Sequence, residues 1–170
     1  MPGPGKGLAV EVAHELGVPV VSMGDLVRRE ATARGLPDIP ASYGQVASEL
    51  RGSQGPDVWA VRTLVELKTI EAPTVLIDGI RNLQEVERFR GALGHDLLLV
   101  AFLASPATRY ARMLGRGRGE DADDEDALRE RDLRELGYGL GGPIAMADVY
   151  VDNEGSADEA RELLRGVLGA

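Results

Sequence analysis

The chain of 170 residues has no cysteine, so it holds neither a disulfide framework nor a thiolate metal site. Its two histidines, His14 and His95, lie far apart and share no ligand spacing, so a zinc site is not expected. It also lacks an apolar run that could span a bilayer, and it does not open with a charged-then-apolar leader. These absences favour a cytoplasmic globular protein with no membrane partner.

Lysine is scarce as well, since only Lys6 and Lys68 are lysine among the 19 basic residues. The net charge is −9, so general affinity for nucleic acid is not expected. Hydrophobic residues make up 44% of the chain, which is ordinary for a folded domain. A lysine at position 6, in a chain that otherwise uses arginine, indicates a role suited to a compact ammonium group on a slim stem.

The chain begins with Met-Pro-Gly-Pro-Gly-Lys-Gly, which matches the second half of the phosphate-binding loop pattern G-x-x-x-x-G-K-[ST]. Gly5 and Lys6 fit the G-K pair, and Gly7 stands where serine or threonine offers a hydroxyl to Mg²⁺. The first glycine of the pattern, and the strand that leads into such a loop, would precede Met1. The pattern therefore predicts a strand encoded upstream of Met1.

In this interpretation Gly3 and Gly5 allow the backbone to approach a phosphate, and Lys6 bridges the β and γ phosphates. The N-terminus of a helix at residues 8–16 adds its dipole. The alternative is a flexible amino terminus rich in proline and glycine. The amphipathic helix and the alternation of strands and helices that follow favour the phosphate-binding loop.

Hydrophobic periodicity and turn residues predict strands that alternate with helices along the chain. Strands are expected at residues 18–22, 74–77, 97–103 and 149–151. Helices are expected at residues 8–16, 25–33, 42–50, 56–70 and 106–114, at 125–136, and after the caps Asn82 and Ser156. Ser42 with Gln45, and Ser156 with Glu159, have the spacing of capping boxes. This alternation predicts one α/β domain in which helices cover both faces of a parallel sheet.

Polar residues follow two of the predicted strands, where ligands bind in open parallel sheets. Asp78 and Arg81 follow the strand at 74–77, and Asp25 and Arg28 follow the strand at 18–22. An aspartate in that place can hold Mg²⁺, and an arginine can bind a phosphate through two hydrogen bonds. The alternatives are a turn aspartate beside a surface arginine and, for Asp25, a helix N-cap. The nearby phosphate-binding loop favours a site at Asp78 and Arg81.

Seven arginines lie between residues 109 and 134, on both sides of an acidic stretch at 120–126. They are Arg109, Arg112, Arg116, Arg118, Arg129, Arg131 and Arg134. They are either solvated cations that balance the acidic stretch, or a lid that closes on phosphates, neutralises their charge and excludes water. The composition leaves both interpretations open.

Taken in order, these motifs resemble those of nucleoside monophosphate kinases. The chain looks like an adenylate kinase over nearly its whole length, and it more closely resembles the archaeal adenylate kinase-related family; dephospho-CoA kinases are more distantly similar. Residues 24–28 are similar to the G-D-[LM]-x-R segment, and residues 112–116 to the lid hinge R-x-x-G-R. Residues 78–81 resemble D-G-F-P-R, one residue shorter and without its proline. Residues 123–131 are similar to the stretch that closes the lid, and 147–156 to the strand and loop that back the adenine ring.

The resemblance implies a P-loop nucleotide kinase fold over residues 1–170, with an acceptor-binding insert at about 24–70 and an arginine lid at about 115–137. It places the absent amino-terminal strand at the centre of the sheet, so the strands at 18–22 and 74–77 are expected apart from the strand at 97–103.

The resemblance also implies ATP and Mg²⁺ as cofactors. The implied ATP-binding residues are Gly3, Pro4, Gly5, Lys6, Gly7, Leu8, Arg112 and Asn153. The implied catalytic residues are Lys6, Arg116, Arg131 and Asp78, with Asp78 also the metal ligand, and the acceptor-binding residues are Asp25, Arg28 and Arg81.

Some positions depart from the family pattern. Gly7 removes a hydroxyl that orders Mg²⁺, so the metal would depend on water and Asp78. Met23 replaces the small hydroxylated residue expected before Gly24, and the lid, at about 117–126, is short and has no zinc-binding cysteines. No set of residues that reads the acceptor base can be identified, and Gln84 is only a candidate.

The leading hypothesis is a phosphotransferase that moves the γ-phosphate of ATP to a nucleoside monophosphate-like acceptor, as a monomer or homodimer. One alternative is a nucleotide-binding regulator that hydrolyses ATP slowly or not at all. A second alternative is a chain that neither binds nor catalyses.

Overall fold

The computed structural model describes residues 3–116 and 124–169. The chain divides into two compact units, one comprising residues 1–18 and 98–170 and the other residues 19–97. We call them unit 1 and unit 2 and describe each by itself. The predicted organisation as a single domain stays a prediction.

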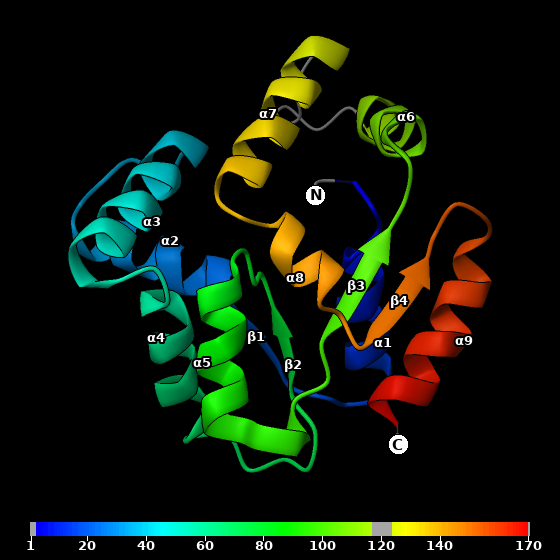
Figure 1. Cartoon of the computed structure of the whole chain (residues 1–170), viewed down its shortest axis with the longest axis horizontal. Helices are drawn as coiled ribbons and strands as arrows, with labels where there is room; N and C mark the ends of the chain where they lie inside the picture. Colours follow the sequence, from blue (N-terminus) through cyan, green and yellow to red (C-terminus); the bar gives the residue numbers. More distant parts are fainter. Residues whose placement is uncertain (1–2, 117–123, 170) are drawn as a thin grey trace. The chain divides into compact units, whose positions relative to one another are not determined.

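Unit 1 holds one two-stranded parallel sheet, made by β3 (Val100–Leu103) and β4 (Val149–Asp152). The register pairs Val100 with Val149 and Leu103 with Asp152, so the carboxyl ends of both strands meet at one edge (Figure 1). The helices of this unit are α1 (Gly7–Glu15), α6 (Pro106–Arg116), α7 (Glu125–Gly137), α8 (Gly141–Ala145) and α9 (Ala157–Leu168).

Helix α1 packs against α9 within unit 1. Val12 and Ala13 of α1 are fully buried, and α9 contributes Ala160 and Leu164 to the buried side chains of this unit. Gly17, at a φ of 70°, stops α1 in the left-handed conformation that glycine adopts without strain. The first helix of the chain is therefore held by apolar packing as well as by its sequence propensity.

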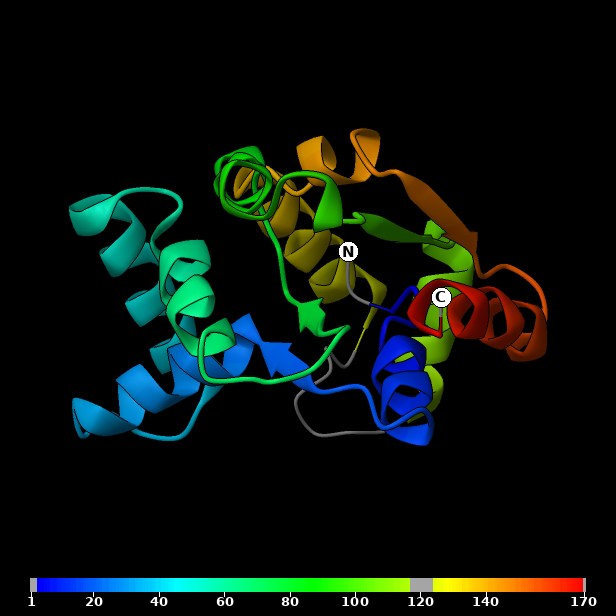
Figure 2. The ribbon, with the colours of Figure 1, turned by 90° about the horizontal axis from the view of Figure 1, so that it is seen from below.

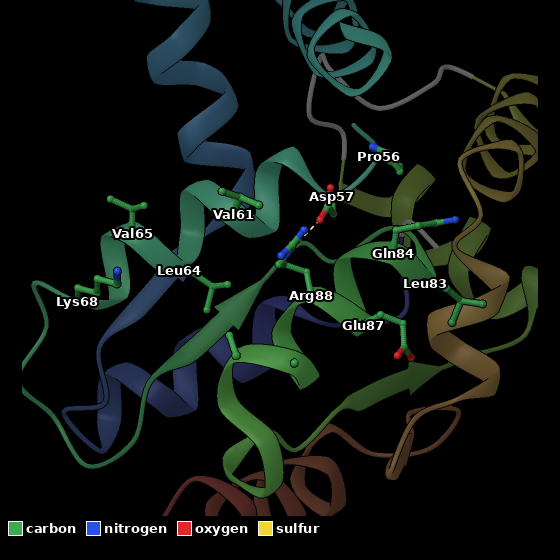
Figure 3. Close-up of a pocket in the computed structure, with 12 residues that line it drawn as sticks. Pro56, Asp57, Val61, Leu64, Val65, Lys68, Leu83, Gln84, Glu87 and Arg88 are labelled. Carbon is green, nitrogen blue, oxygen red and sulfur yellow. Dashed lines mark hydrogen bonds and ion pairs between the residues drawn. The ribbon is translucent and has the colours of Figure 1, made fainter. Parts of the chain in front are cut away.

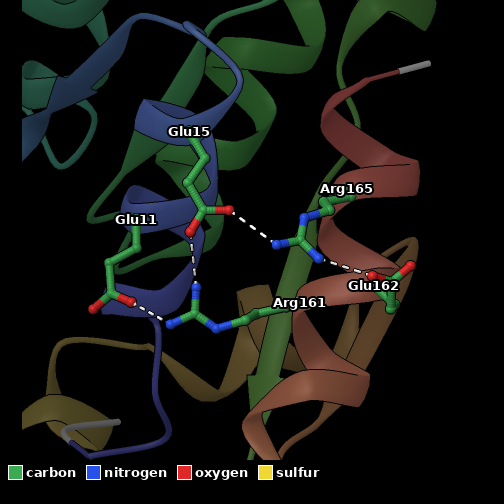
Figure 4. A network of polar contacts seen from close by, with 5 residues as sticks. All are labelled: Glu11, Glu15, Arg161, Glu162 and Arg165. Carbon is green, nitrogen blue, oxygen red and sulfur yellow. Dashed lines mark hydrogen bonds and ion pairs between the residues drawn. The ribbon is translucent and has the colours of Figure 1, made fainter.

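Ion pairs cross the solvent side of the α1–α9 contact (Figure 4). Arg161 reaches Glu11 at 2.7 Å and Glu15 at 3.1 Å, and Arg165 reaches Glu15 at 3.0 Å. Within α9, Arg165 also pairs with Glu162 at 2.8 Å. Exposed pairs of this kind contribute about 0–1 kcal/mol each. We assign this network to the stability of unit 1 and not to chemistry.

Unit 2 holds the other two-stranded parallel sheet, made by β1 (Val20–Ser22) and β2 (Leu76–Asp78). Its helices are α2 (Met23–Ala33), α3 (Pro40–Gln54), α4 (Val58–Leu67) and α5 (Leu83–Leu93), followed by the short 3₁₀ helix η1 (Gly94–Asp96). These helices gather around one buried cluster that includes Val46, Trp59 and Phe89, all fully buried. Figure 2 shows α2 to α5 beside β1 and β2 in a second view.

The predicted α/β class with parallel strands agrees with this architecture. Among the described residues the strands pair as β1 with β2 and β3 with β4. The predicted strand before the phosphate-binding loop lies outside the chain and stays a prediction.

Two local predictions and one alternative interpretation were wrong. The helix expected at 42–50 is α3, which begins at Pro40 and continues through Gly52, with Ser42 buried inside it and not at its cap. Proline at a first helical position and the burial of Val46 and Leu50 outweigh the helix-breaking glycine. Ser156 is the N-cap residue of α9, but its side chain makes no cap hydrogen bond.

The third correction concerns Asp25, which is not an N-cap. Ser22 caps α2, and its hydroxyl accepts a hydrogen bond from the backbone amide of Asp25 at 3.3 Å. The cap at Asn82 is confirmed, since its side chain accepts the amide of Glu85 at 2.8 Å. Helix α8 and the 3₁₀ helix η1 were not predicted.

Candidate functional site

The loop that opens unit 1 has the backbone of an anion-binding turn. Gly3 and Gly5 have φ values of 78° and 94°, in the region that residues with a Cβ rarely adopt. The amide of Leu8 donates to the carbonyl of Gly5 at 2.8 Å, and the amide of Ala9 donates to that of Lys6 at 3.0 Å. Helix α1 begins at Gly7, directly after the loop. The first amides of a helix and its dipole attract anions, so this turn is suited to a phosphate.

Asn153, directly after β4, fixes the loop from one side. Its side-chain nitrogen donates to the carbonyl of Pro4 at 2.8 Å, and its backbone amide donates to the carbonyl of Leu103 at 2.9 Å. A Cβ added to Gly5 would lie 2.1 Å from that side-chain nitrogen. The side chain of Asn153 is buried, and its Oδ1 has no hydrogen-bond partner among the described residues. The carboxyl end of the β3–β4 sheet is therefore tied directly to the candidate phosphate loop.

Helix α6 supports the same loop at Gly3. A Cβ there would meet the carbonyl oxygen of Arg109 at 3.0 Å and the Cγ of Met113 at 3.2 Å. Close packing and positive φ thus both require glycine at positions 3 and 5.

The remaining residues of the loop differ in their exposure. Lys6 and Gly7 are exposed, and a Cβ at Gly7 would have no neighbour within 4 Å. Pro4 is buried, as is Leu8, whose side chain is 8% exposed, so Leu8 can offer a ligand little beyond its backbone. Position 7 therefore has room for the hydroxyl side chain that the pattern expects and this chain lacks.

Arg109 lies in a buried ion pair that joins α6 to α7. Its guanidinium donates twice to Asp132, at 2.8 and 2.5 Å, and the hydroxyl of Tyr110 donates to the same carboxylate at 2.9 Å. The Asp132 carboxylate raises the pKa of Arg109 above its ordinary value. With an exposed fraction of 4%, Arg109 is a structural cation in this arrangement and not one of the arginines that solvent or a ligand reaches.

The other arginines considered for ATP lie on the same two helices. Arg112 is partly buried, and its Nη1 is buried without a hydrogen-bond partner in the part of the chain that the structure describes. Arg116 is the last residue of α6, and Arg131, which is half-buried, lies in α7. Arg118, with most of the predicted lid at 117–126, lies outside the described residues.

The loop after β4 also holds an acidic side chain against the start of α6. The carboxylate of Glu154 accepts from the hydroxyl of Thr108 at 2.5 Å and from the amide of Ser105. These hydrogen bonds, the one from Thr108 first, lower the pKa of Glu154, and the charge of Arg112 adds a smaller effect. The end of β4 thus contacts the candidate loop through Asn153 and α6 through Glu154.

In unit 2 the two predicted strand-end motifs lie next to one another. Ser22 and Asp78 are register partners at the ends of β1 and β2. A Cβ added to Gly79, whose φ is 109°, would lie 3.3 Å from the Cβ of Met23. The bend after β2 therefore packs on the first turn of α2. Arg28 and Arg81, the arginines of the two motifs, come shortly after these strand ends in the chain.

Asp25 and Arg28 form an ion pair on the exposed side of α2. About half of each side chain is exposed, at 57% for Asp25 and 51% for Arg28. Asp25 therefore holds the guanidinium of Arg28 while leaving it accessible to an anion.

The backbone of Arg81 is held by Glu85, which stands three residues after the predicted cap Asn82. The backbone amide of Arg81 donates to Glu85 Oε2 at 2.7 Å, and Arg51 donates to Glu85 Oε1 at 2.8 Å. The spacing of Asn82 and Glu85 was the one sequence signal that could have indicated a role for Glu85. No sequence signal indicated its contact with Arg51, which lies on another helix.

Unit 2 also contains a pocket of about 800 Å³ between α4 and α5 (Figure 3). The ion pair of Arg88 with Asp57, at 2.6 Å, lies at this pocket. It is lined by Pro56, Asp57, Val61, Leu64, Val65, Lys68, Leu83, Gln84, Glu87, Arg88, Gly91 and Ala92. None of the predicted catalytic, cofactor-binding or acceptor-binding residues is among them; only the candidate base-reading residue Gln84 is.

Two further observations limit the chemistry of the described residues. No group of three or more His, Cys, Asp or Glu side chains among them is arranged to hold a metal ion. None of their helices combines the length and the apolar character needed to cross a membrane.

Comparisons with known proteins found similarity over most of the chain. A family model described as an AAA domain matches residues 1–129. A UPF0200 protein from Methanoculleus marisnigri is 42% identical over 168 residues, covering 99% of this chain and 91% of that protein. A UPF0200 protein from Methanopyrus kandleri is 47% identical over 174 residues, covering 100% of this chain and 86% of that protein.

A UPF0200/UPF0201 protein from Archaeoglobus fulgidus is 43% identical over 166 residues. The match covers 96% of this chain but spans only 51% of that relative. The names of these relatives specify neither a reaction nor a substrate.

Proposed function

Because this chain belongs to the UPF0200 family and carries an AAA domain of the P-loop kinase-like kind, which indicates nucleotide binding, we propose that it is an ATP-dependent phosphotransferase. It moves the γ-phosphate of ATP to a nucleotide-type acceptor, of the size and charge of a nucleoside monophosphate. The observation that carries this proposal is the loop of two positive-φ glycines, at positions 3 and 5, which ends in Lys6 at the start of α1. The similarity to adenylate kinase-related proteins and dephospho-CoA kinases is part of this proposal.

Unit 1 supplies the groups proposed for ATP. The backbone of residues 3–8 binds the phosphates, and Lys6 contributes its charge to the β and γ groups. Arg112 and Asn153 contact the nucleoside of ATP. Arg112 Nη1 offers it a hydrogen-bond donor and Asn153 Oδ1 an acceptor, since both atoms are buried without a partner among the described residues. Arg116 and Arg131 add positive charge as the γ-phosphate is transferred. Transfer by this route needs positioning and charge neutralisation, and it needs no covalent enzyme intermediate.

Mg²⁺ fits this proposal as a cofactor held mainly by phosphates and water. Magnesium sites of kinases use one or two carboxylates and retain several waters, so a lone Asp78 is a sufficient protein ligand. The absence of a side chain at Gly7 leaves the metal without a loop hydroxyl. Bound there, Mg²⁺ would neutralise charge on the β and γ phosphates.

Unit 2 supplies the groups proposed for the acceptor. Arg28 and Arg81 follow the ends of the two strands, and each can bind the acceptor phosphate through two hydrogen bonds. Asp25 orients Arg28 through their ion pair. We further propose a cytoplasmic location and a monomeric or homodimeric state, with no nucleic-acid or membrane partner.

The test is to measure ADP formation from ATP and Mg²⁺ against a panel of nucleoside monophosphates and dephospho-CoA. The wild-type chain is compared with Lys6→Ala and with Arg165→Ala, which removes an exposed arginine outside the proposed site. We expect one acceptor to stimulate ADP formation in the wild type and in Arg165→Ala, and Lys6→Ala to abolish it. Background activity with every acceptor, equal in all three proteins, would refute the proposal.

The missing hydroxyl at Gly7 favours one second candidate function, a nucleotide-binding regulator with little or no transferase activity. Calorimetry separates the two. Tight ATP binding that depends on Lys6, without transfer to any acceptor, would favour the regulator.

A further inference from the structure

Glu85 is a fully buried carboxylate in the first turn of α5, and both of its oxygens are used within unit 2. Oε1 accepts from Arg51 of α3 at 2.8 Å, and Oε2 accepts from the backbone amide of Arg81 at 2.7 Å. Its own amide donates to the cap residue Asn82 at 2.8 Å. One carboxylate therefore joins helix α3, the N-terminus of α5 and the segment that carries the proposed acceptor arginine.

A helix cap alone does not require this arrangement. Capping at Asn82 uses an amide side chain and needs no charge at position 85. Burying a carboxylate and a guanidinium costs free energy, which their attraction recovers only with good geometry and further hydrogen bonds. The side chain of Glu85 is fully buried and that of Arg51 is 15% exposed.

The pair is also not optimised for stability. Arg51 Nε is buried without a hydrogen-bond partner among the described residues, and an unsatisfied buried donor costs free energy. A purely stabilising contact at this place would be better served by apolar side chains of similar volume. A buried, directional pair with an unsatisfied donor is better explained by the position that it imposes on its neighbours.

That position is the segment between β2 and α5. Gly79 bends it at a φ of 109°, and Asn82 tethers its other end by donating to the carbonyl of Pro56 at 3.0 Å. Glu85 fixes the backbone of Arg81 between these two points. The segment is therefore constrained at Gly79, at Arg81 and at Asn82, as a preorganised anion-binding residue requires.

We propose that Glu85 and Arg51 are positioning residues that orient Arg81 for the phosphate of the acceptor. The inference rests on the proposed function, because it concerns the acceptor side of that reaction. It assigns the acceptor affinity of the protein to a buried charge pair that does not itself touch the substrate.

The test compares steady-state kinetics of the wild type with Glu85→Gln and Arg51→Met. Glutamine must turn its amide nitrogen toward either Arg51 or the Arg81 amide, both of which are donors. We expect the KM for the acceptor to rise about tenfold in each variant, with the KM for ATP unchanged; tenfold corresponds to about 1.4 kcal/mol. Arg51→Lys keeps a cation without the planar fork, so it should give a smaller rise in the same KM.

Arg88→Met is the matched control, since it removes another ion pair of α5, to Asp57, that has no contact with Arg81. It should leave both KM values unchanged. The fluorescence of Trp59, fully buried in the core of unit 2, reports whether each variant is folded. The hydrogen exchange rate of the Arg81 amide gives a readout that does not depend on activity, and it should rise in Glu85→Gln and stay unchanged in Arg88→Met.

The outcomes separate this inference from the proposed function. A wild type without activity on any acceptor refutes the proposed function, and exchange at Arg81 then still decides whether Glu85 holds that backbone. An active wild type whose acceptor KM and Arg81 exchange are both unaffected by Glu85→Gln and Arg51→Met refutes the positioning role. Equal rises in the KM for ATP and for the acceptor would also refute it, because they would indicate a general structural defect.

Discussion

Gly5 is the position at which one methyl group tests the geometry of the candidate phosphate loop. An alanine there must adopt a φ of 94°, and a left-handed conformation costs a residue with a Cβ about 1–2 kcal/mol. The new methyl would also lie 2.1 Å from Asn153 Nδ2, which would have to move and release the carbonyl of Pro4. Losing a hydrogen bond at a buried carbonyl costs about 1–3 kcal/mol. We therefore expect Gly5→Ala to destabilise unit 1 by about 2–5 kcal/mol.

Gly7→Ala is the matched control, two residues along the same chain. Its φ is not positive, and a Cβ there meets nothing within 4 Å. Alanine at the start of α1 should therefore be neutral, or stabilise by up to about 1 kcal/mol.

The assay is urea unfolding followed by far-UV circular dichroism, together with hydrogen exchange of the α1 amides. The only tryptophan, Trp59, belongs to unit 2, so its fluorescence reports the other unit and is unsuitable here. Equal free energies of unfolding for Gly5→Ala and Gly7→Ala would refute the loop geometry.

A double-mutant cycle then separates the two costs at Gly5. Asn153→Ala removes the clash and the hydrogen bond, so in that background Gly5→Ala should cost only the backbone strain of about 1–2 kcal/mol. If Gly5→Ala costs as much in the Asn153→Ala background as in the wild type, Asn153 does not support the loop.

Further predictions concern unit 1. Asp132→Ala removes the carboxylate that two hydrogen bonds join to buried Arg109, so it should lower the free energy of unfolding by about 3–5 kcal/mol in urea titrations; a loss below 1 kcal/mol would contradict the structural role of the pair. The pKa of Glu154 is lowered chiefly by the Thr108 hydroxyl, so the stability it contributes is full above its ordinary pKa of 4.5 and is lost as the pH falls through the lowered pKa. Thr108→Val should raise that pKa in an NMR titration, and an unchanged value would exclude the hydrogen bond as its cause. Arg161→Ala removes two ion pairs on the solvent side, so it should cost at most about 2 kcal/mol at low salt and less at high salt; an effect independent of salt would contradict an electrostatic origin.

Backbone conformation and helix capping could be predicted from the sequence where a few neighbouring residues control them. Glycines at positions 3 and 5 predicted a loop whose backbone can approach a phosphate, and the structure adds that both adopt a positive φ. The cap at Asn82 and the parallel pairing of apolar strands were likewise predicted, since cap spacing and strand burial are local patterns. The helix predicted at residues 42–50 is shorter than α3, because Gly52 does not end a helix that buries Val46 and Leu50.

Arginine chemistry, by contrast, could not be assigned from composition. Arg109 and Arg131 read alike in the sequence, as cations beside an acidic stretch. The fold places Asp132 against Arg109 and buries both, which removes Arg109 from the set of arginines available to a ligand. The distinction depends on which carboxylate faces which guanidinium, and residues 109 and 132, which lie on different helices, come together only in the folded chain.

The sequence by itself determined the class of this protein: an α/β chain that opens with a turn of glycines and a lysine and carries acidic and arginine residues at its strand ends. Those features follow from backbone conformation and periodicity, which neighbouring residues control. Only the tertiary structure decided what holds those elements in place. Asn153 meets Pro4, and Glu85 meets both Arg51 and Arg81, through contacts between residues distant in the sequence. Such contacts depend on how helices and strands pack, because a buried polar atom must find its partner wherever the fold supplies one.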